Sequence, residues 1–237
     1  MSYKKVGLIL PSPNIHMEPQ FYALRLPDID FFTTRIMLKE TTEEALVQME
    51  KDLDYASQLL ATVHPDVGGY CCTSGSFIRG DAFDRGIMRT IEKNCGCPGV
   101  TTSFAMADAF TTLGISRVAL VTPYTDAINA RECEYIESKG VRVVAAFGFQ
   151  KVVNEELVAL TEQEWIDAAM RIDTPQADAL FLSCTNTKAM PVVDLLEKRL
   201  NKPVLTSNSV TLWKMLRETG ERKQIENCGI LLREYLK

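Results

Sequence analysis

The sequence predicts an α/β protein built from two pseudo-symmetric, Rossmann-like (flavodoxin-like) halves, each with a largely parallel sheet. The main observation is a repeat, because residues 66–76, DVGGYCCTSGS, have a counterpart in residues 177–187, ADALFLSCTNT. The Cys-Thr pairs of these segments lie 112 residues apart, as do Val6 and Val118 in the first apolar run of each half. Strands and helices follow in the same order twice, which is typical of a duplicated doubly wound fold.

Two apolar runs open the first half. Residues 5–10 and 31–38 are compact and apolar enough to form strands. Between the second of these runs and the first cysteine segment we expect one helix, capped by Thr41 or Thr42 and running to about residue 63. Apolar residues recur there at helical spacing and acidic residues crowd the first turn.

The first cysteine segment, at 66–72, reads as a buried strand that ends in a hydroxyl-rich turn. A helix is expected near residues 81–94, then a short strand at 98–103 and a helix through Leu113. The first half is therefore assigned to residues 1–113.

The second half, residues 114–237, repeats this order. Its expected elements are a strand at 117–122, a helix at 126–139, a strand at 141–147, a helix at 161–172, the second cysteine strand at 177–184, a helix through Leu200, a strand at 203–208 and a helix around Trp213. Thr161 and Glu164 have the spacing of a capping box. The C-terminal helix is free to pack back on the first half.

Composition excludes several classes of function. The 237 residues carry a formal charge of −5, which offers no electrostatic attraction to nucleic acid or to an anionic membrane surface. There is no uncharged apolar run long enough to cross a bilayer and no secretory signal, so we expect a cytoplasmic protein. Seven cysteines, an odd number, are expected to be reduced thiols, and with only two histidines a metal site is not expected.

The repeated cysteines suggest the chemistry. In open α/β sheets ligands bind beyond the carboxyl ends of the strands, so Cys72 and Cys184 are expected to approach one ligand from opposite sides of a cleft. A thiol is mostly protonated at neutral pH, but backbone N–H groups at a helix start favour the reactive thiolate. Donors expected to hold a substrate carboxylate follow both cysteines: Thr73, Ser74, Thr185 and Asn186.

Four motifs resemble a known family. They are PSPN at 11–14 with Met17-Glu18, YCCTSGSF at 70–77 with Arg79-Gly80, TPY at 122–124 with Asn129, and LSCT at 182–185. In this order, and over essentially the whole chain, they resemble the aspartate/glutamate racemase superfamily, most of all its maleate cis-trans isomerase and arylmalonate decarboxylase branch. The resemblance implies a cofactor-independent enzyme that acts on a small carboxylate in a cleft between two Rossmann-like halves. It also suggests a homodimer or higher homo-oligomer.

The resemblance implies a role for four residues. Cys72 matches the nucleophilic cysteine of the maleate isomerases and Cys184 their second, acid/base cysteine. Asn14 matches an asparagine that grips a substrate carboxylate, and Tyr124 a tyrosine near it. The decarboxylases have glycine at the position of Cys72, which argues against simple decarboxylation here.

Some residues depart from the isomerase pattern. Residues 73–80 look more like the decarboxylase, and Ile15-His16 replaces small hydroxylic residues. The alternatives are therefore an amino-acid or hydantoin-type racemase, an arylmalonate-type decarboxylase and an ectoine-utilisation enzyme of the same superfamily.

Two mechanisms fit two opposed thiols. In one, Cys72 adds to the double bond of a cis diacid and Cys184 handles the proton. In the other, the pair works as base and acid on opposite faces of a carbon next to a carboxylate. The rival from another class, a non-catalytic ligand-binding module, explains the duplication but not the matched cysteines. The sequence assigns no role to His16, Arg79, Ser207 or Asn208.

Overall fold

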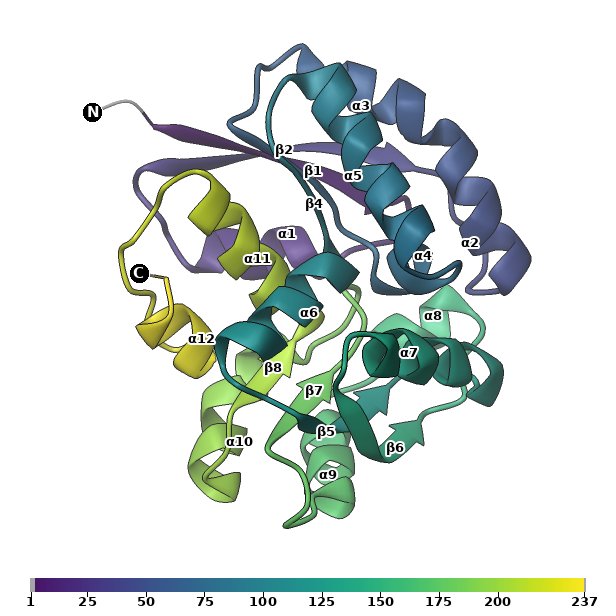
Figure 1. Ribbon diagram of the computed structural model, residues 1–237, viewed down its shortest axis with the longest axis vertical. Helices are drawn as coiled ribbons and strands as arrows, with labels where there is room; N and C mark the ends of the chain where they lie inside the picture. Colours follow the sequence, from purple (N-terminus) through teal and green to yellow (C-terminus); the bar gives the residue numbers. More distant parts are fainter. Residues whose placement is uncertain (1–2, 237) are drawn as a thin grey trace.

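The computed structural model describes residues 3–236 and contains two four-stranded sheets, both parallel throughout (Figure 1). The first sheet has the order β2-β1-β3-β4, with β1 (Lys4–Pro11), β2 (Ile29–Ile36), β3 (Val67–Tyr70) and β4 (Gly99–Thr101). The second has the order β6-β5-β7-β8, with β5 (Arg117–Thr122), β6 (Arg142–Gly148), β7 (Ala179–Leu182) and β8 (Val204–Thr206). The matching strand orders confirm the predicted pair of α/β halves.

Helices flank both sheets. In the first half they are α1 (Met17–Ala23), α2 (Glu43–Met49), α3 (Leu53–Ala61), α4 (Thr73–Phe77), α5 (Asp81–Cys95) and α6 (Thr102–Thr112). In the second half they are α7 (Asp126–Ser138), α8 (Asn154–Ala159), α9 (Glu162–Ile172), α10 (Val193–Leu200), α11 (Ser207–Glu218) and α12 (Gly229–Glu234). The capping box predicted at the start of α9 is present. Sequence periodicity missed α1, α4, α8 and α12, which have only five to seven residues and are too short to show a helical repeat.

The single helix expected up to residue 63 was wrong. A 3₁₀ turn at Glu50–Asp52 separates α2 from α3. Met49 and Leu53 on either side of the turn are both buried. The apolar spacing therefore continues across the break, which explains why the sequence predicted one helix.

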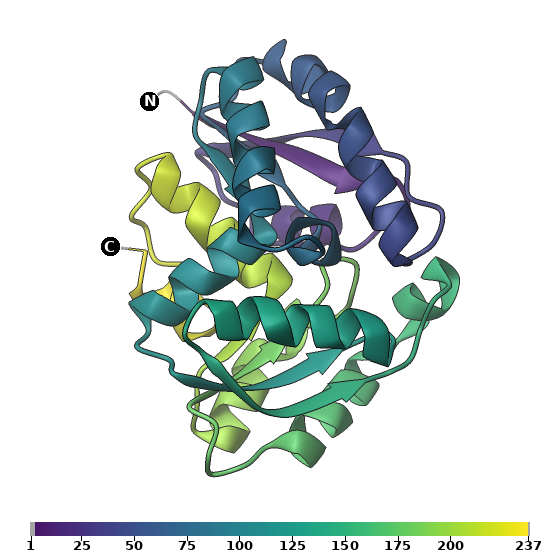
Figure 2. The same cartoon turned by 45° about the vertical axis from the view of Figure 1, so that its right-hand side comes forward.

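Two helices lie side by side between the sheets, α6 and α11 (Figures 1 and 2). Phe110 of α6 packs edge-on against Phe181 of β7, with 5.7 Å between ring centroids, so a helix of the first half covers the second sheet. In return α11 contacts β3 and β4 of the first sheet. Gly69 on β3 permits this approach, because a Cβ there would lie 2.7 Å from Met215 of α11. The division of the chain between residues 113 and 114 stays a prediction.

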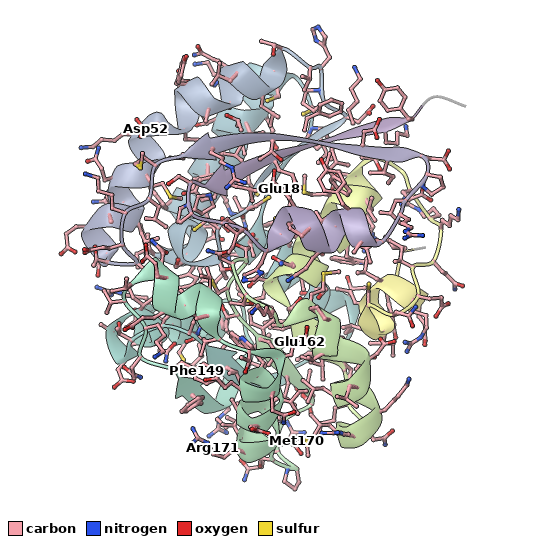
Figure 3. All side chains as sticks on the ribbon, turned by 180° about the vertical axis from the view of Figure 1, so that it is seen from behind. Glu18, Asp52, Phe149, Glu162, Met170 and Arg171 are labelled. Atoms are coloured by element: carbon pink, nitrogen blue, oxygen red, sulfur yellow. The ribbon has the colours of Figure 1, made fainter. Side chains whose placement is uncertain are left out.

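The main hydrophobic core runs through both halves, and a smaller cluster lies on the other face of the second sheet. In that cluster Phe149 packs edge-on against the buried Trp165 of α9 at 5.4 Å. Seen from behind, Phe149 and Arg171 lie over this outer face (Figure 3).

Parallel registers bring the important turns together. Tyr70 pairs with Ile9 and Thr101 in the first sheet, and Leu182 pairs with Val121 and Thr206 in the second. The turns after these strands therefore leave each sheet at a common edge.

Within residues 3–236 no helix is long and apolar enough to cross a membrane. All seven cysteines are free thiols. The same residues contain no cluster of three or more His, Cys, Asp or Glu side chains arranged to hold a metal ion.

Candidate active site

Cys72 caps the start of α4. Its extended backbone (φ −140°, ψ 111°) turns the chain out of β3, and its Sγ accepts the N–H of Gly75 at 3.3 Å. The hydroxyl of Ser74 lies 3.9 Å from the same sulfur. Burial raises the pKa of Cys72 to about 11, while Gly75 and Ser74 oppose this rise because they stabilise the thiolate.

Cys184 occupies a different kind of turn, after β7. Its φ of +89° lies in the left-handed region, which costs a non-glycine residue on the order of 1–3 kcal/mol and is typical of functional sites. Its N–H donates to Ser207 Oγ at 2.9 Å, and its Sγ accepts the N–H of Asn186 at 3.5 Å. Burial raises the pKa of this thiol to about 12, against hydrogen bonds from Asn186 and Tyr124.

The two cysteines line one cavity between the halves. Negative charge on Cys72 raises the pKa of Cys184, so the sulfurs are close enough to interact. The cavity is lined by Pro11, Pro13, Leu38, Thr41, Cys72, Thr73, Ser74, Tyr124, Asn154, Leu157, Cys184, Thr185 and Asn186. Its volume of about 20 Å³ has room for roughly one water molecule. A diacid therefore enters only if the surrounding segments move.

Buried hydrogen bonds join the cysteine turns across the halves. Thr73 Oγ1 donates to Ser207 Oγ at 2.8 Å, and Thr185 Oγ1 donates to the carbonyl of Cys71 at 3.0 Å. Asn186 Nδ2 donates to the carbonyl of Pro13 at 3.0 Å. These bonds fix the position of each thiol relative to the opposite half.

Seven of the eight predicted site residues lie on the cavity wall: Cys72, Thr73, Ser74, Tyr124, Cys184, Thr185 and Asn186. The eighth, Asn14, is fully buried directly behind the wall. Its Nδ2 donates to Thr185 Oγ1 at 3.1 Å and its Oδ1 accepts the N–H groups of His16 and Met17. In this closed state Asn14 orders the second cysteine turn.

The residues left without a role lie outside the cavity wall. Ser207 connects Thr73 to the backbone of Cys184, whereas Asn208 donates to Gln20 Oε1 at 2.6 Å. His16 contacts the carbonyl of Val158 through Nε2 at 3.2 Å. Arg79 lies in a separate groove beside α7.

The sequence missed the residues that close the cavity. Thr41 N–H donates to the carbonyl of Val152 at 3.3 Å, and Asn154 Nδ2 donates to the carbonyl of Lys39 at 2.9 Å. These bonds join the segment after β2 to the start of α8, and so cover the cysteines from both halves. Asn154 begins a six-residue helix that has no recognisable motif, so the sequence carried no signal for it.

Electrostatically, the cavity wall has no lysine or arginine. A substrate carboxylate would be held by amide and hydroxyl donors. Tyr124 is one of these groups, and its ring packs edge-on against Phe77 with 6.4 Å between centroids. Burial raises the pKa of its hydroxyl, so it stays a neutral hydrogen-bond donor.

A family model described as arylmalonate decarboxylase matches residues 6–232. The chain belongs to this family. It is also 26% identical over 242 residues to maleate isomerase of Geobacillus stearothermophilus, covering 96% of both chains. To arylmalonate decarboxylase of Bordetella bronchiseptica it is 28% identical over 226 residues, covering 91% of this chain and 90% of that protein.

Solved structures of the family have the same fold. Maleate isomerase Iso of Pseudomonas putida S16, crystallised with maleate as a cysteine-to-alanine variant, superposes with a TM-score of 0.94 at 26% identity. The match covers 100% of both chains. Together these findings confirm the resemblance to the maleate isomerase and arylmalonate decarboxylase branch.

Proposed function

We propose that this chain is a cofactor-independent isomerase that converts a small cis-unsaturated diacid, maleate or a close analogue, into its trans isomer. The observation that carries the proposal is the shared cavity, to which each half contributes one cysteine. The similarity to maleate isomerases over nearly the whole chain supports the same reaction. A protein that only binds a ligand would have no need for two thiols at this position.

Cys72 starts the proposed reaction. After losing its proton to solvent, its thiolate attacks one alkene carbon and forms a C–S bond. The electron pair of the double bond moves to the neighbouring carbon, which takes the proton of Cys184. The former double bond is now single and rotates. Cys184 then removes the proton, the C–S bond breaks, and the trans double bond forms as Cys72 leaves.

The surroundings of the two sulfurs support this division of work. Negative charge on Cys72 raises the pKa of Cys184, so ionisation of Cys72 keeps the proton on Cys184. Donors from Gly75 and Ser74 at the start of α4 stabilise the thiolate of Cys72. Cys184 keeps its proton longer, which suits a proton donor.

Neutral donors would bind the substrate carboxylates. Those on the cavity wall are Thr41, Thr73, Ser74, Tyr124, Asn154, Thr185 and Asn186. Oriented N–H and O–H groups in a dry site stabilise the charge that develops beside the attacked carbon. The proposal also includes the cytoplasmic location expected from the sequence and the homodimer or higher homo-oligomer suggested by the resemblance.

The test is incubation with maleate in D₂O, followed by proton NMR. We expect fumarate to accumulate, and Cys72→Ala to reduce the rate by at least about 10³-fold, because the other thiol on the wall, Cys184, is the proton donor and cannot also serve as the nucleophile. Cys95→Ala, at the end of α5 and outside the cavity wall, is the matched control and should retain wild-type turnover. Near-normal turnover by Cys72→Ala would refute the mechanism.

Decarboxylation of an arylmalonate is the second candidate, because the family model and the Bordetella relative carry that name. It needs one proton donor, which Cys184 provides, and leaves Cys72 without a task. Parallel incubations with phenylmalonate and with D- and L-aspartate distinguish the candidates. Carbon dioxide release would indicate a decarboxylase, and deuterium at the α-carbon with loss of optical activity would indicate a racemase.

A further inference from the structure

A carboxyl group with no cationic partner is buried behind the second cysteine. Glu132, in the middle of α7, is fully buried. Its Oε1 accepts the hydroxyl hydrogen of Ser183 at 2.6 Å, while Oε2 has no hydrogen-bond partner among the described residues. Carboxyl groups are rarely buried this way, because desolvation strongly disfavours their charged form.

The position of Glu132 connects it to the thiol. Ser183, its hydrogen-bond partner, directly precedes Cys184 in the chain. Negative charge on Glu132 raises the pKa of both Cys184 and Tyr124, so the carboxyl is near both. Burial raises the pKa of Glu132 itself to about 8, opposed only by the hydrogen bond from Ser183.

Few other charges face Glu132. On its own helix, Glu132 raises the pKa of Cys133. Asp84 of α5 and Glu43 of α2 also face α7, where they contact Tyr135 and Arg131, and neither contributes to the pKa shift of Glu132. The adjacent helix α4 contains no titratable side chain, and β6, the strand that packs on α7, contributes only Arg142, which is exposed at the far end. The ionisation of Glu132 is therefore coupled mainly to the cavity.

The duplicated halves differ at this point. The residue that corresponds to Ser183, 112 positions earlier, is Cys71, whose Sγ donates to the carbonyl of Gly69 at 3.4 Å. No acidic side chain contributes to the pKa shift of Cys72. The carboxyl stands behind only one of the two thiols.

We propose that Glu132 is a positioning residue for Cys184, which holds the Ser183–Cys184 turn and sets the upper pH limit for proton donation by this thiol. The proposal rests on the proposed function of Cys184 as proton donor. While Glu132 is neutral, Cys184 can give its proton away and carry the resulting charge. Once Glu132 ionises, a second negative charge nearby is disfavoured, and Cys184 retains its proton.

The test compares wild type with Glu132→Gln, which keeps an oxygen acceptor for Ser183 but cannot ionise. Glu134→Gln is the matched control, because Glu134 is on the same helix and exposed. The rate of Cys184 alkylation by iodoacetamide is measured without substrate between pH 9 and 10.5, where Glu132 is ionised in the wild type and Cys184 is still below its pKa of about 12. Its tryptic peptide, residues 172–188, contains no other cysteine.

We expect Glu132→Gln to lower the pKa of Cys184, as removal of a nearby like charge should, and so to raise its alkylation rate by about threefold or more at each pH. The control should keep the wild-type rate. Identical rates in wild type and Glu132→Gln would overturn the proposal.

A second measurement does not need access to the thiol. In wild-type protein with ¹³C at the side-chain carboxyls of glutamate, one resonance should titrate near pH 8 and be absent from Glu132→Gln. If all glutamate carboxyls titrate below about pH 6, the proposal is wrong.

Turnover gives a third readout that separates the two proposals. With maleate, the pH at which kcat falls to half its maximum on the alkaline side should rise by about one unit in Glu132→Gln. A raised alkylation rate in Glu132→Gln without turnover of maleate would refute the proposed substrate but support the role of Glu132.

Discussion

The hydroxyl of Thr73 donates to Ser207 Oγ at 2.8 Å, a hydrogen bond that joins two residues 134 positions apart in the sequence. Ser207 Oγ also accepts the N–H of Cys184. Thr73 follows Cys72 directly, so one buried serine connects the turns of both thiols. The distance between the nucleophile and the proton donor depends on this contact.

Ser207→Ala should therefore reduce kcat by about 10- to 100-fold with a smaller effect on KM, because slight misplacement of reacting groups slows the chemical step. The lost hydrogen bonds should cost about 1–3 kcal/mol in the free energy of unfolding. Steady-state kinetics and urea unfolding measure both. Ser209→Ala, which breaks the cap of the same helix, is the control: comparable destabilisation with wild-type kcat is expected, and equal kcat losses would contradict the argument.

Removal of the proton donor should trap the substrate on the nucleophile. In Cys184→Ser, we expect Cys72 to add to maleate and the neighbouring carbon to take its proton from water. The later proton removal should be slowed, because a serine hydroxyl ionises far less than a thiol and is a poor base. Intact-protein mass spectrometry should show a gain equal to one substrate molecule, mapped to Cys72. The double variant with Cys72→Ala should show no gain. An adduct that survives in the double variant would exclude Cys72 as the nucleophile.

Opening of the cavity should depend on Asn154. Asn154→Ala removes its hydrogen bond to the Lys39 carbonyl, which is worth about 0.5–1.5 kcal/mol, so the open state should become about 2- to 10-fold more populated. Faster alkylation of Cys72 by iodoacetamide and a higher KM are the expected readouts. Asn94→Ala, which breaks a hydrogen bond between α5 and α3 away from the cavity, is the control. Unchanged alkylation in Asn154→Ala would mean that other contacts keep the segment after β2 and the start of α8 closed over the cavity.

A buried aspartate predicts how stability depends on pH. Burial raises the pKa of Asp84 from 3.8 to about 6, although the hydroxyl of Tyr135, at 2.6 Å, opposes the rise. Between these pH values the folded state binds more protons than the unfolded state, so the contribution of Asp84 to stability falls as pH rises from about 4 to about 6. An asparagine at this position does not titrate. In Asp84→Asn the free energy of unfolding should therefore fall by about 2–3 kcal/mol less than in wild type over this pH range.

Urea unfolding at several pH values measures the difference between wild type and Asp84→Asn. Asp178 is a control of opposite sign, because Arg117 lowers its pKa and its contribution to stability rises with pH. A constant difference between wild type and Asp84→Asn from pH 4 to 6 would contradict the prediction.

The sequence predicted the parts of the protein that depend on local pattern. Short apolar runs marked all eight strands, and the spacing of Thr161 and Glu164 marked the start of α9, because caps and strand alternation involve residues close together in the chain. The 112-residue repeat placed Cys72 and Cys184 after equivalent strands. Parallel topology then required that both lie at the carboxyl edges of their sheets.

Only the tertiary structure decided how the halves combine. The exchange of α6 and α11 depends on the contact of Met215 with Gly69 and of Phe110 with Phe181, and no local pattern specifies such distant partners. The closure of the cavity by Asn154 and the burial of Glu132 have the same origin. A polar residue in a helix reads as exposed until packing removes its water, and packing joins residues far apart in the chain. The sequence therefore determined which thiols matter, while the fold decided what surrounds them.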